Sequence, residues 1–155
     1  MRLQPLRAFL WLLFVPLAGY AFEADPYVEV LIPNGMPIKI EVQRDQRDPE
    51  ILKYVFRRIV PKDVARAKIT VVMLGDDGAI KFQSPMAGDA LSDQMTVATV
   101  DASVTRLLVV VNWVETNQGR WVPDTKNQQL DIGELIRCGA KGLPKAKFIS
   151  HKPTA

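Results

Sequence analysis

The 155-residue chain has few of the side chains from which most enzyme and metal sites are built. It contains one cysteine, Cys138, and one histidine, His151. A structural zinc site takes four ligands, mostly cysteine and histidine, so these two residues cannot form one. His151 lies near the C-terminus in a segment rich in lysine and proline, where a buried general base is not expected. A serine or cysteine triad is therefore disfavoured as well.

The sequence also lacks glycine-rich phosphate loops, dinucleotide-binding motifs and EF-hand spacings. We therefore expect a protein that is not an enzyme and carries no cofactor and no metal. One cysteine cannot close a disulfide within the chain, so the core must be stabilised by packing. We expect Cys138 to be a small buried hydrophobic residue, with a disulfide between two molecules as the alternative.

The first residues have the order of a secretory signal. Two arginines precede an apolar run over residues 8–17, and small residues follow it, ending at Ala21. We predict a signal peptide over residues 1–21, with Ala24 as an alternative end. An uncleaved membrane anchor is disfavoured, because a spanning helix needs about 20 apolar residues and Pro16 interrupts this shorter run.

Removal of this segment changes the charge balance. The whole chain has 20 Lys and Arg against 17 Asp and Glu, and the leader holds two of the bases and no acid. The mature chain then has 18 bases against 17 acids, a net charge of +1. A nucleic-acid-binding domain would need a clustered basic face, so we expect no nucleic-acid partner. We expect a secreted or periplasmic bacterial protein with no membrane span after cleavage.

Short runs in which apolar and polar residues alternate recur along the mature chain, as half-buried β-strands require. The Asp77-Gly78 pair is typical of a tight hairpin turn, because both residues tolerate a positive φ. A turn-type cluster, Pro33-Asn-Gly-Met36, separates the first two runs, which we expect to form a strand pair. Residues 84–93 are predicted to be a loop. The predicted strands in this part of the chain are residues 27–32, 37–42, 64–74, 79–83 and 94–100.

Residues 106–124, RLLVVVNWVETNQGRWVPD, contain an apolar run, a polar turn and a short return that ends at Pro123. Apolar residues occupy both faces of the run, which predicts a central strand covered on both sides. If residues 116–119 form the turn, Val114 lies opposite Trp121. A longer loop would instead place the two tryptophans of this hairpin opposite each other.

Trp113 follows Val109 and Val111 at the strand period, so we expect it in the core. Trp121 lies on a short strand beside a proline, and the sequence leaves its exposure open. A pair of exposed indoles could stack on sugar rings or anchor a partner.

After Asp124 the strand-like alternation of apolar and polar residues ends. Asp131 is a suitable N-cap for a helix over residues 132–137, and Gly139 is suitable for its end. Residues 139–155 contain no acid, and we expect them to form a loose basic tail. Its lysines could contact anionic lipid or a cell-wall polymer, although a solvated tail is the simpler expectation. They are residues 141, 145, 147 and 152.

About seven short strands with frequent turn signals and one short helix predict an all-β fold. The pattern predicts a β-sandwich with a short C-terminal helix. One domain is expected over residues 22–138, followed by the tail over 139–155.

Five short motifs lie within residues 51–124: Leu52-Lys-Tyr-Val-Phe-Arg-Arg58, Lys62-Asp-Val64, Val71-Val-Met-Leu-Gly-Asp-Asp-Gly78, Val111-Asn-Trp-Val-Glu115 and Gly119-Arg-Trp121. In these motifs the chain resembles small secreted bacterial immunoglobulin-like or fibronectin-III-like domains, including the FxLYD-like group. The resemblance implies an immunoglobulin-like antiparallel β-sandwich in which the late tryptophan is structural, with no catalytic residues to carry over. It also favours a strand over residues 50–60, which could alternatively form a helix capped by Asp48 and Pro49.

These observations predict a non-enzymatic binding or structural module whose partner is an unknown protein or a component of the cell envelope. Two alternatives are a carbohydrate-binding module that uses Trp121 and a small hydrolase that uses paired carboxylates. The same carboxylates could hold calcium, but aspartates in turns more often bond to their own backbone. No catalytic, metal-binding or ligand-binding residue is assigned. The carboxylates near turns are Asp76, Asp77, Asp89, Asp93, Glu115 and Asp124.

Overall fold

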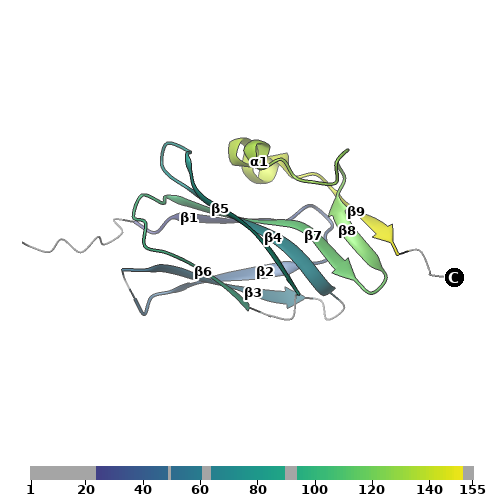
Figure 1. The fold of residues 1–155 in the computed structure, drawn as a ribbon, viewed down its shortest axis with the longest axis horizontal. Coiled ribbons are helices and arrows are strands. Elements are labelled where there is room, and N and C mark those ends of the chain that lie inside the picture. The colour runs from purple at the N-terminus through teal and green to yellow at the C-terminus, as the bar shows by residue number, and fades with distance from the viewer. Residues whose placement is uncertain (1–23, 49, 61–63, 90–93, 152–155) are drawn as a thin grey trace, which may run out of the picture.

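A computed structural model describes residues 24–48, 50–60, 64–89 and 94–151. In this part of the chain the fold is mostly antiparallel β, with two sheets and one short helix (Figure 1). The expectation of an all-β fold is confirmed. The predicted signal peptide and its cleavage site lie outside the described residues.

Six strands form the large sheet, in the order β5-β4-β7-β8-β9 with β1 beside β7. All of its pairings are antiparallel except that of β1, which runs parallel to the first half of β7. The strands are β1 (Tyr27–Leu31), β4 (Val64–Leu74), β5 (Ile80–Asp89), β7 (Arg106–Thr116), β8 (Gly119–Pro123) and β9 (Ala146–Ser150).

Three strands form the small sheet, in the order β2-β3-β6. They are β2 (Lys39–Asp45), β3 (Leu52–Val60) and β6 (Gln94–Thr99). β3 confirms that residues 50–60 contain a strand and no helix. Its alternation places Leu52, Tyr54 and Phe56 on the buried face. These three side chains pack against the large sheet and form the main core with Val71 and Val109.

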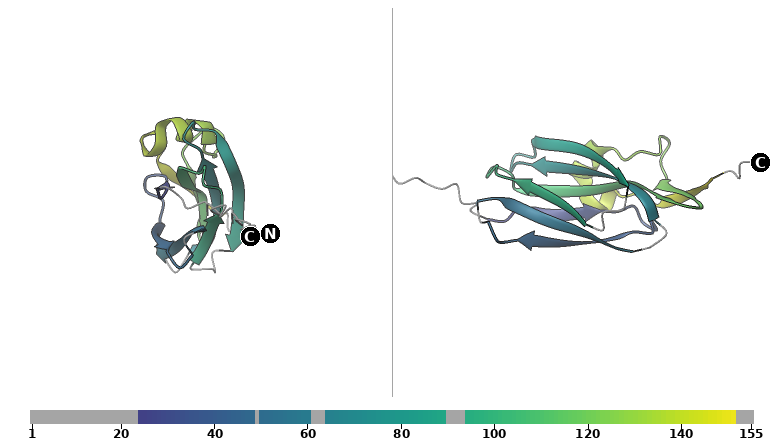
Figure 2. Two further views of the ribbon diagram at one scale, coloured as in Figure 1. Left: turned by 90° about the vertical axis from the view of Figure 1, so that its left-hand side faces the viewer. Right: turned by 60° about the horizontal axis from the view of Figure 1, so that its bottom comes forward.

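The helix α1 (Ile132–Cys138) covers the opposite face of the large sheet, which we call the outer face. Asp131 accepts a hydrogen bond from the Glu134 backbone N–H, and Gly139 ends the helix with a φ of 57°, both as predicted. Leu135 packs on Leu108 and Val110 of β7. Figures 1 and 2 show the three resulting layers: α1, the large sheet and the small sheet.

Two predictions about the strands are wrong. The first two strands do not pair, because β1 joins the large sheet and β2 the small one. Residues 84–89 continue strand β5 and are not a loop. An edge strand tolerates Pro85, because the N–H that a proline lacks can face away from the sheet. Of the predicted loop, only residues 90–93 lie outside the described part.

The expectation of a loose tail after Gly139 is also wrong for much of that segment. Residues 139–142 form a 3₁₀ turn, and β9 pairs with the whole of β8. The approach of the two strands is close at Gly119, where a Cβ would clash with the carbonyl oxygen of Ile149. A glycine is therefore required here for β9 to dock.

Candidate functional site

An extra residue in β7 decides where the first tryptophan of the hairpin points. Lys68 of β4 lies opposite Trp113, but its neighbour Ile69 lies opposite Val111, so Asn112 has no opposite residue. This is a β-bulge. Asn112 donates a hydrogen bond through Nδ2 to Thr70 Oγ1 at 2.8 Å.

The bulge reverses the alternation of side chains in the rest of β7. Val111 and Val114 both face the core, and Trp113 lies on the outer face instead of beside Val111. The prediction that Trp113 closes the core is therefore wrong. Its side chain is half-buried, and it belongs to none of the three apolar clusters of the described residues.

The indole of Trp113 lies under a guanidinium group. Arg120 Cζ is 4.3 Å from the centroid of the ring, which is a close cation–π contact. Arg120 Nη2 also donates to Glu115 Oε1 at 2.9 Å. Glu115 is shared, because His151 Nε2 lies 3.8 Å from the same oxygen. The carboxylate thus fixes the arginine, and the arginine fixes the indole.

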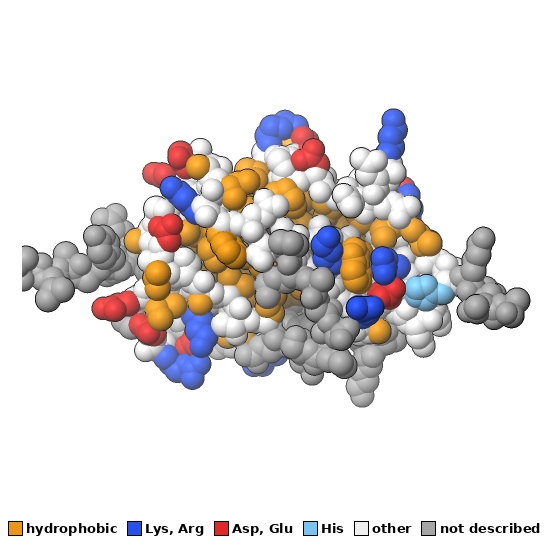
Figure 3. Space-filling view, viewed as in Figure 1, with side chains coloured by type: hydrophobic (Ala, Val, Ile, Leu, Met, Phe, Trp, Pro, Cys, Tyr) orange, Lys and Arg blue, Asp and Glu red, His pale blue; other side chains and the backbone are white. Residues whose placement is uncertain are grey.

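Neighbouring strands add side chains to the same face. Lys68 of β4 lies opposite Trp113, and Ile149 of β9 lies opposite Arg120 with 39% of its surface exposed. Figure 3 shows positive side chains on both sides of a hydrophobic one, with a negative side chain and the histidine nearby. We call this set the Trp113 surface; it consists of Lys68, Trp113, Glu115, Arg120, Ile149 and His151.

Trp121 lies on the other side of the sheet. It pairs with Val114, so the turn at residues 116–119 has the predicted register. Its ring contacts that of Phe148, with the centroids 5.2 Å apart, and packs against the core cluster that contains Val114. Trp121 is half-buried between these groups. The two tryptophans therefore do not form a common platform.

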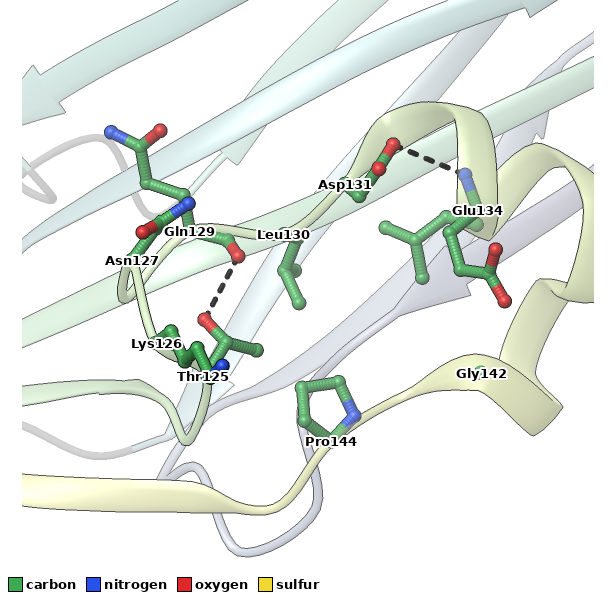
Figure 4. A pocket seen from close by; sticks show the side chains of 10 residues that line it. Thr125, Lys126, Asn127, Gln129, Leu130, Asp131, Glu134, Gly142 and Pro144 are labelled. Carbon is green, nitrogen blue, oxygen red and sulfur yellow. Dashed lines mark hydrogen bonds between the residues drawn. The ribbon is translucent and has the colours of Figure 1, made fainter.

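A second candidate site is a hollow of about 330 Å³ beside α1. Figure 4 shows that loop residues Thr125 and Gln129 form one side, whereas Asp131 and Glu134 come from the start of α1. The loop uses its own polar groups: Thr125 Oγ1 donates to the Gln129 carbonyl at 3.0 Å, and Asp131 caps the helix. This hollow is consequently less well equipped to bind a ligand than the Trp113 surface.

Cys138 is half-buried at the end of α1, so the prediction that it is fully buried is wrong. Its Sγ donates a hydrogen bond to Glu134 Oε1 at 3.2 Å, which raises the pKa of the thiol, and burial adds to this effect. Glu134 also bonds to Arg137, which lowers the pKa of the carboxyl group. The thiol is thus stabilised in its protonated, unreactive form.

Four of the six carboxylates that could have formed a hydrolase or calcium site have structural partners. Asp76 and Asp77 accept hydrogen bonds from backbone N–H groups of their own turn. Glu115 pairs with Arg120, and Asp124 pairs with Lys147 at 3.0 Å. Asp89 ends β5. Asp93 lies outside the described residues, among which no three His, Cys, Asp or Glu side chains gather as metal ligands would.

The sequence contained one signal for the Trp113 surface that the periodicity argument missed. Asn112 is the only polar residue between Leu107 and Val114. An amide side chain in the middle of a buried strand needs a hydrogen-bond partner, and a bulge supplies one. The turn over residues 116–119, one of the two registers that the sequence allows, also places Glu115 opposite Arg120.

No protein-family model, curated protein or solved structure matches this chain. Within the described residues, α1 and the other helical turn are too short and too polar to cross a membrane.

Proposed function

We propose that this chain is a secreted or periplasmic, non-enzymatic binding module with an immunoglobulin-like β-sandwich, and that it holds a cell-envelope partner on the Trp113 surface. Export is supported by the order of residues in the leader. The sandwich is supported by two facing sheets that bury a common core around Val109.

The observation that carries the proposal is the bulge at Asn112, which takes a tryptophan out of a core strand and holds it beneath Arg120. Tryptophan and arginine dominate the binding energy of many interfaces. Since Glu115 already fixes Arg120, little side-chain freedom is lost when a partner binds. The alternative that uses Trp121 is less well supported, because that ring is occupied by Phe148 and the core.

The test is sedimentation of the mature protein with envelopes isolated from the bacterium that makes it. Trp113→Ala removes the centre of the proposed surface. Phe82→Ala is the matched control, because Phe82 is an aromatic residue of another strand and is 48% exposed. We expect the wild type and Phe82→Ala to sediment with the envelopes and Trp113→Ala to stay in solution. Equal sedimentation of both variants, or none by the wild type, contradicts the proposal.

The export half of the proposal has a separate test. N-terminal sequencing of the protein recovered outside the cytoplasm should begin at Phe22, or at Asp25 if Ala24 is the end of the signal. Recovery of the intact N-terminus from that fraction contradicts export by cleavage.

A further inference from the structure

The outer face around Trp113 collects positive charge from three strands that are distant in sequence. Lys68 comes from β4, Arg120 from β8 and Lys147 from β9. Lys147 lies opposite Val122, which follows Arg120 on the same face of β8. Lys68 lies opposite Trp113, and Arg120 lies opposite Glu115, two residues further along β7. Since adjacent strands lie about 4.8 Å apart, the three cations lie within one region of the outer face.

Two of these cations have room for a ligand. Lys68 is half-buried opposite Trp113 and forms no ion pair with any acid among the residues that the structure describes. Arg120 gives one amino group to Glu115 and retains 42% exposure of its side chain. A guanidinium group has five N–H donors, so donors remain for a second acceptor. Charge-assisted bonds of this kind favour carboxylate or phosphate oxygens.

The tryptophan points to the same class of ligand. Arg120 covers one face of the indole, so a neutral sugar ring cannot stack there. The edge of an aromatic ring carries partial positive charge. An indole beside Lys68 and Arg120 therefore adds to the attraction for an anion.

The acidic side chains among the cations help to decide whether the anions come from a membrane or from a polysaccharide. Glu115 is 13% exposed and pairs with Arg120, whereas Asp124 is 61% exposed and pairs with Lys147. The exposed Asp124 carboxylate weakens the attraction for a uniformly anionic membrane. Sugar hydroxyl groups, in contrast, can donate hydrogen bonds to it. A polymer with both carboxylates and hydroxyls therefore fits this face better than a membrane does.

We infer that the Trp113 surface, extended by Lys147, binds an acidic polysaccharide, with Lys68 and Arg120 contacting its carboxylates. The inference rests on the proposed function and names the class of its partner. It also gives the basic C-terminal strand a role, because β9 brings Lys147 and His151 to this surface.

The experiment is titration of the mature protein with polygalacturonate, followed by tryptophan fluorescence and calorimetry. The matched ligand is the methyl ester of the same polymer, which keeps the hydroxyls and removes the charge. We expect binding to the acid and none to the ester. Raising the salt concentration from about 0.1 M to about 1 M should weaken binding to polygalacturonate, because the Debye length falls from about 10 Å to about 3 Å.

Two lysine variants locate the site. Lys68→Gln should weaken binding about tenfold, because it removes a charge-assisted contact. Lys39→Gln is the control, since Lys39 is an exposed lysine of the small sheet. Both variants must melt within a few degrees of the wild type. Equal affinities for the two variants, or equal binding of the ester, overturn the inference.

Two further results separate this inference from the proposed function. Binding to vesicles that contain phosphatidylglycerol, with none to polygalacturonate, overturns the polysaccharide in favour of a membrane. Sedimentation with envelopes that requires Trp113, with no polygalacturonate binding, leaves the proposed function standing and overturns only the ligand class.

Discussion

The two halves of β7 belong to one strand but have different surroundings. In the first half, Leu108 and Val110 pack under α1, whereas Leu107 and Val109 pack on the small sheet, and none is more than 2% exposed. In the second half only the inner face is covered, and Trp113 lies on the open side. The burial of a side chain in β7 therefore depends on which element packs on its face of the sheet. The bulge determines the face on which each side chain of the second half lies.

Insertion of an alanine between Lys68 and Ile69 should abolish the difference between the halves. The inserted residue would lie opposite Asn112 and make the pairing of β4 with β7 regular. A shift of one residue exchanges the faces of a strand, so Val114 would turn outward and Trp113 would enter a core without space for it. We expect a loss of at least about 4 kcal/mol in the free energy of unfolding, measured by urea denaturation.

Asn112→Ala is the control for that insertion, because it keeps the bulge and loses the hydrogen bond to Thr70. It should cost about 1 kcal/mol. An insertion variant whose stability lies within about 1 kcal/mol of the wild type would show that the bulge is not required.

In the first half, Leu108→Ala should cost about 3–5 kcal/mol. Leu108 has no exposed surface and contacts the cluster that joins the sheet to α1. Thermal or urea unfolding of the variant provides the measurement. A loss below about 1 kcal/mol would mean that α1 does not hold this face of the strand.

The two tryptophans of the hairpin should differ in their contribution to stability. Trp121→Ala should cost about 2–3 kcal/mol, because its ring packs on Val114 and Phe148. Trp113→Ala should cost about 1 kcal/mol, since a partly exposed cation–π contact is the main one it loses. Strand periodicity alone predicts the opposite order, with the larger loss of stability for Trp113→Ala. Urea midpoints of the two variants in parallel decide between them.

The smallest predicted effect concerns Cys138 at the end of α1, the helix that covers the first half of β7. The bond from the Cys138 thiol to Glu134 raises the pKa of the thiol above its ordinary value, so the reactive thiolate forms only at higher pH. Alkylation by iodoacetamide should accelerate at a higher pH than for free cysteine, and Glu134→Ala should move that pH down. Rates measured from about pH 7 to about pH 10 test this; an unchanged midpoint in the variant contradicts it.

Several elements could be predicted because their local signals agree with their surroundings. Leu52, Tyr54 and Phe56 alternate and meet a facing sheet, so β3 follows from its sequence. The hairpin between β7 and β8 follows from a polar turn between apolar runs. Asp131 and Gly139 mark the ends of α1 through backbone chemistry that acts over a few residues.

Other features depend on contacts between distant residues and were not predictable from local patterns. The lysines around Phe148 resemble a solvated tail, but lysine is also common on edge strands, where it discourages further pairing. β1 and β2 look like a hairpin, yet β1 joins β7 far along the chain. Trp113 fits the strand period, and only the partner strand β4 fixes the position of the bulge.

The parallel pairing of β1 with β7 has a consequence for the order of folding. The strand at the centre of the large sheet needs β1 from the beginning of the chain and β8 from near its end. Contacts of such long sequence separation form slowly, because the loop between them must close first. During synthesis β7 cannot acquire its full set of neighbours before residue 123 has been added. Until β7 itself has been made, β1 has no strand to pair with, and it lies open to any factor that binds an unfolded chain.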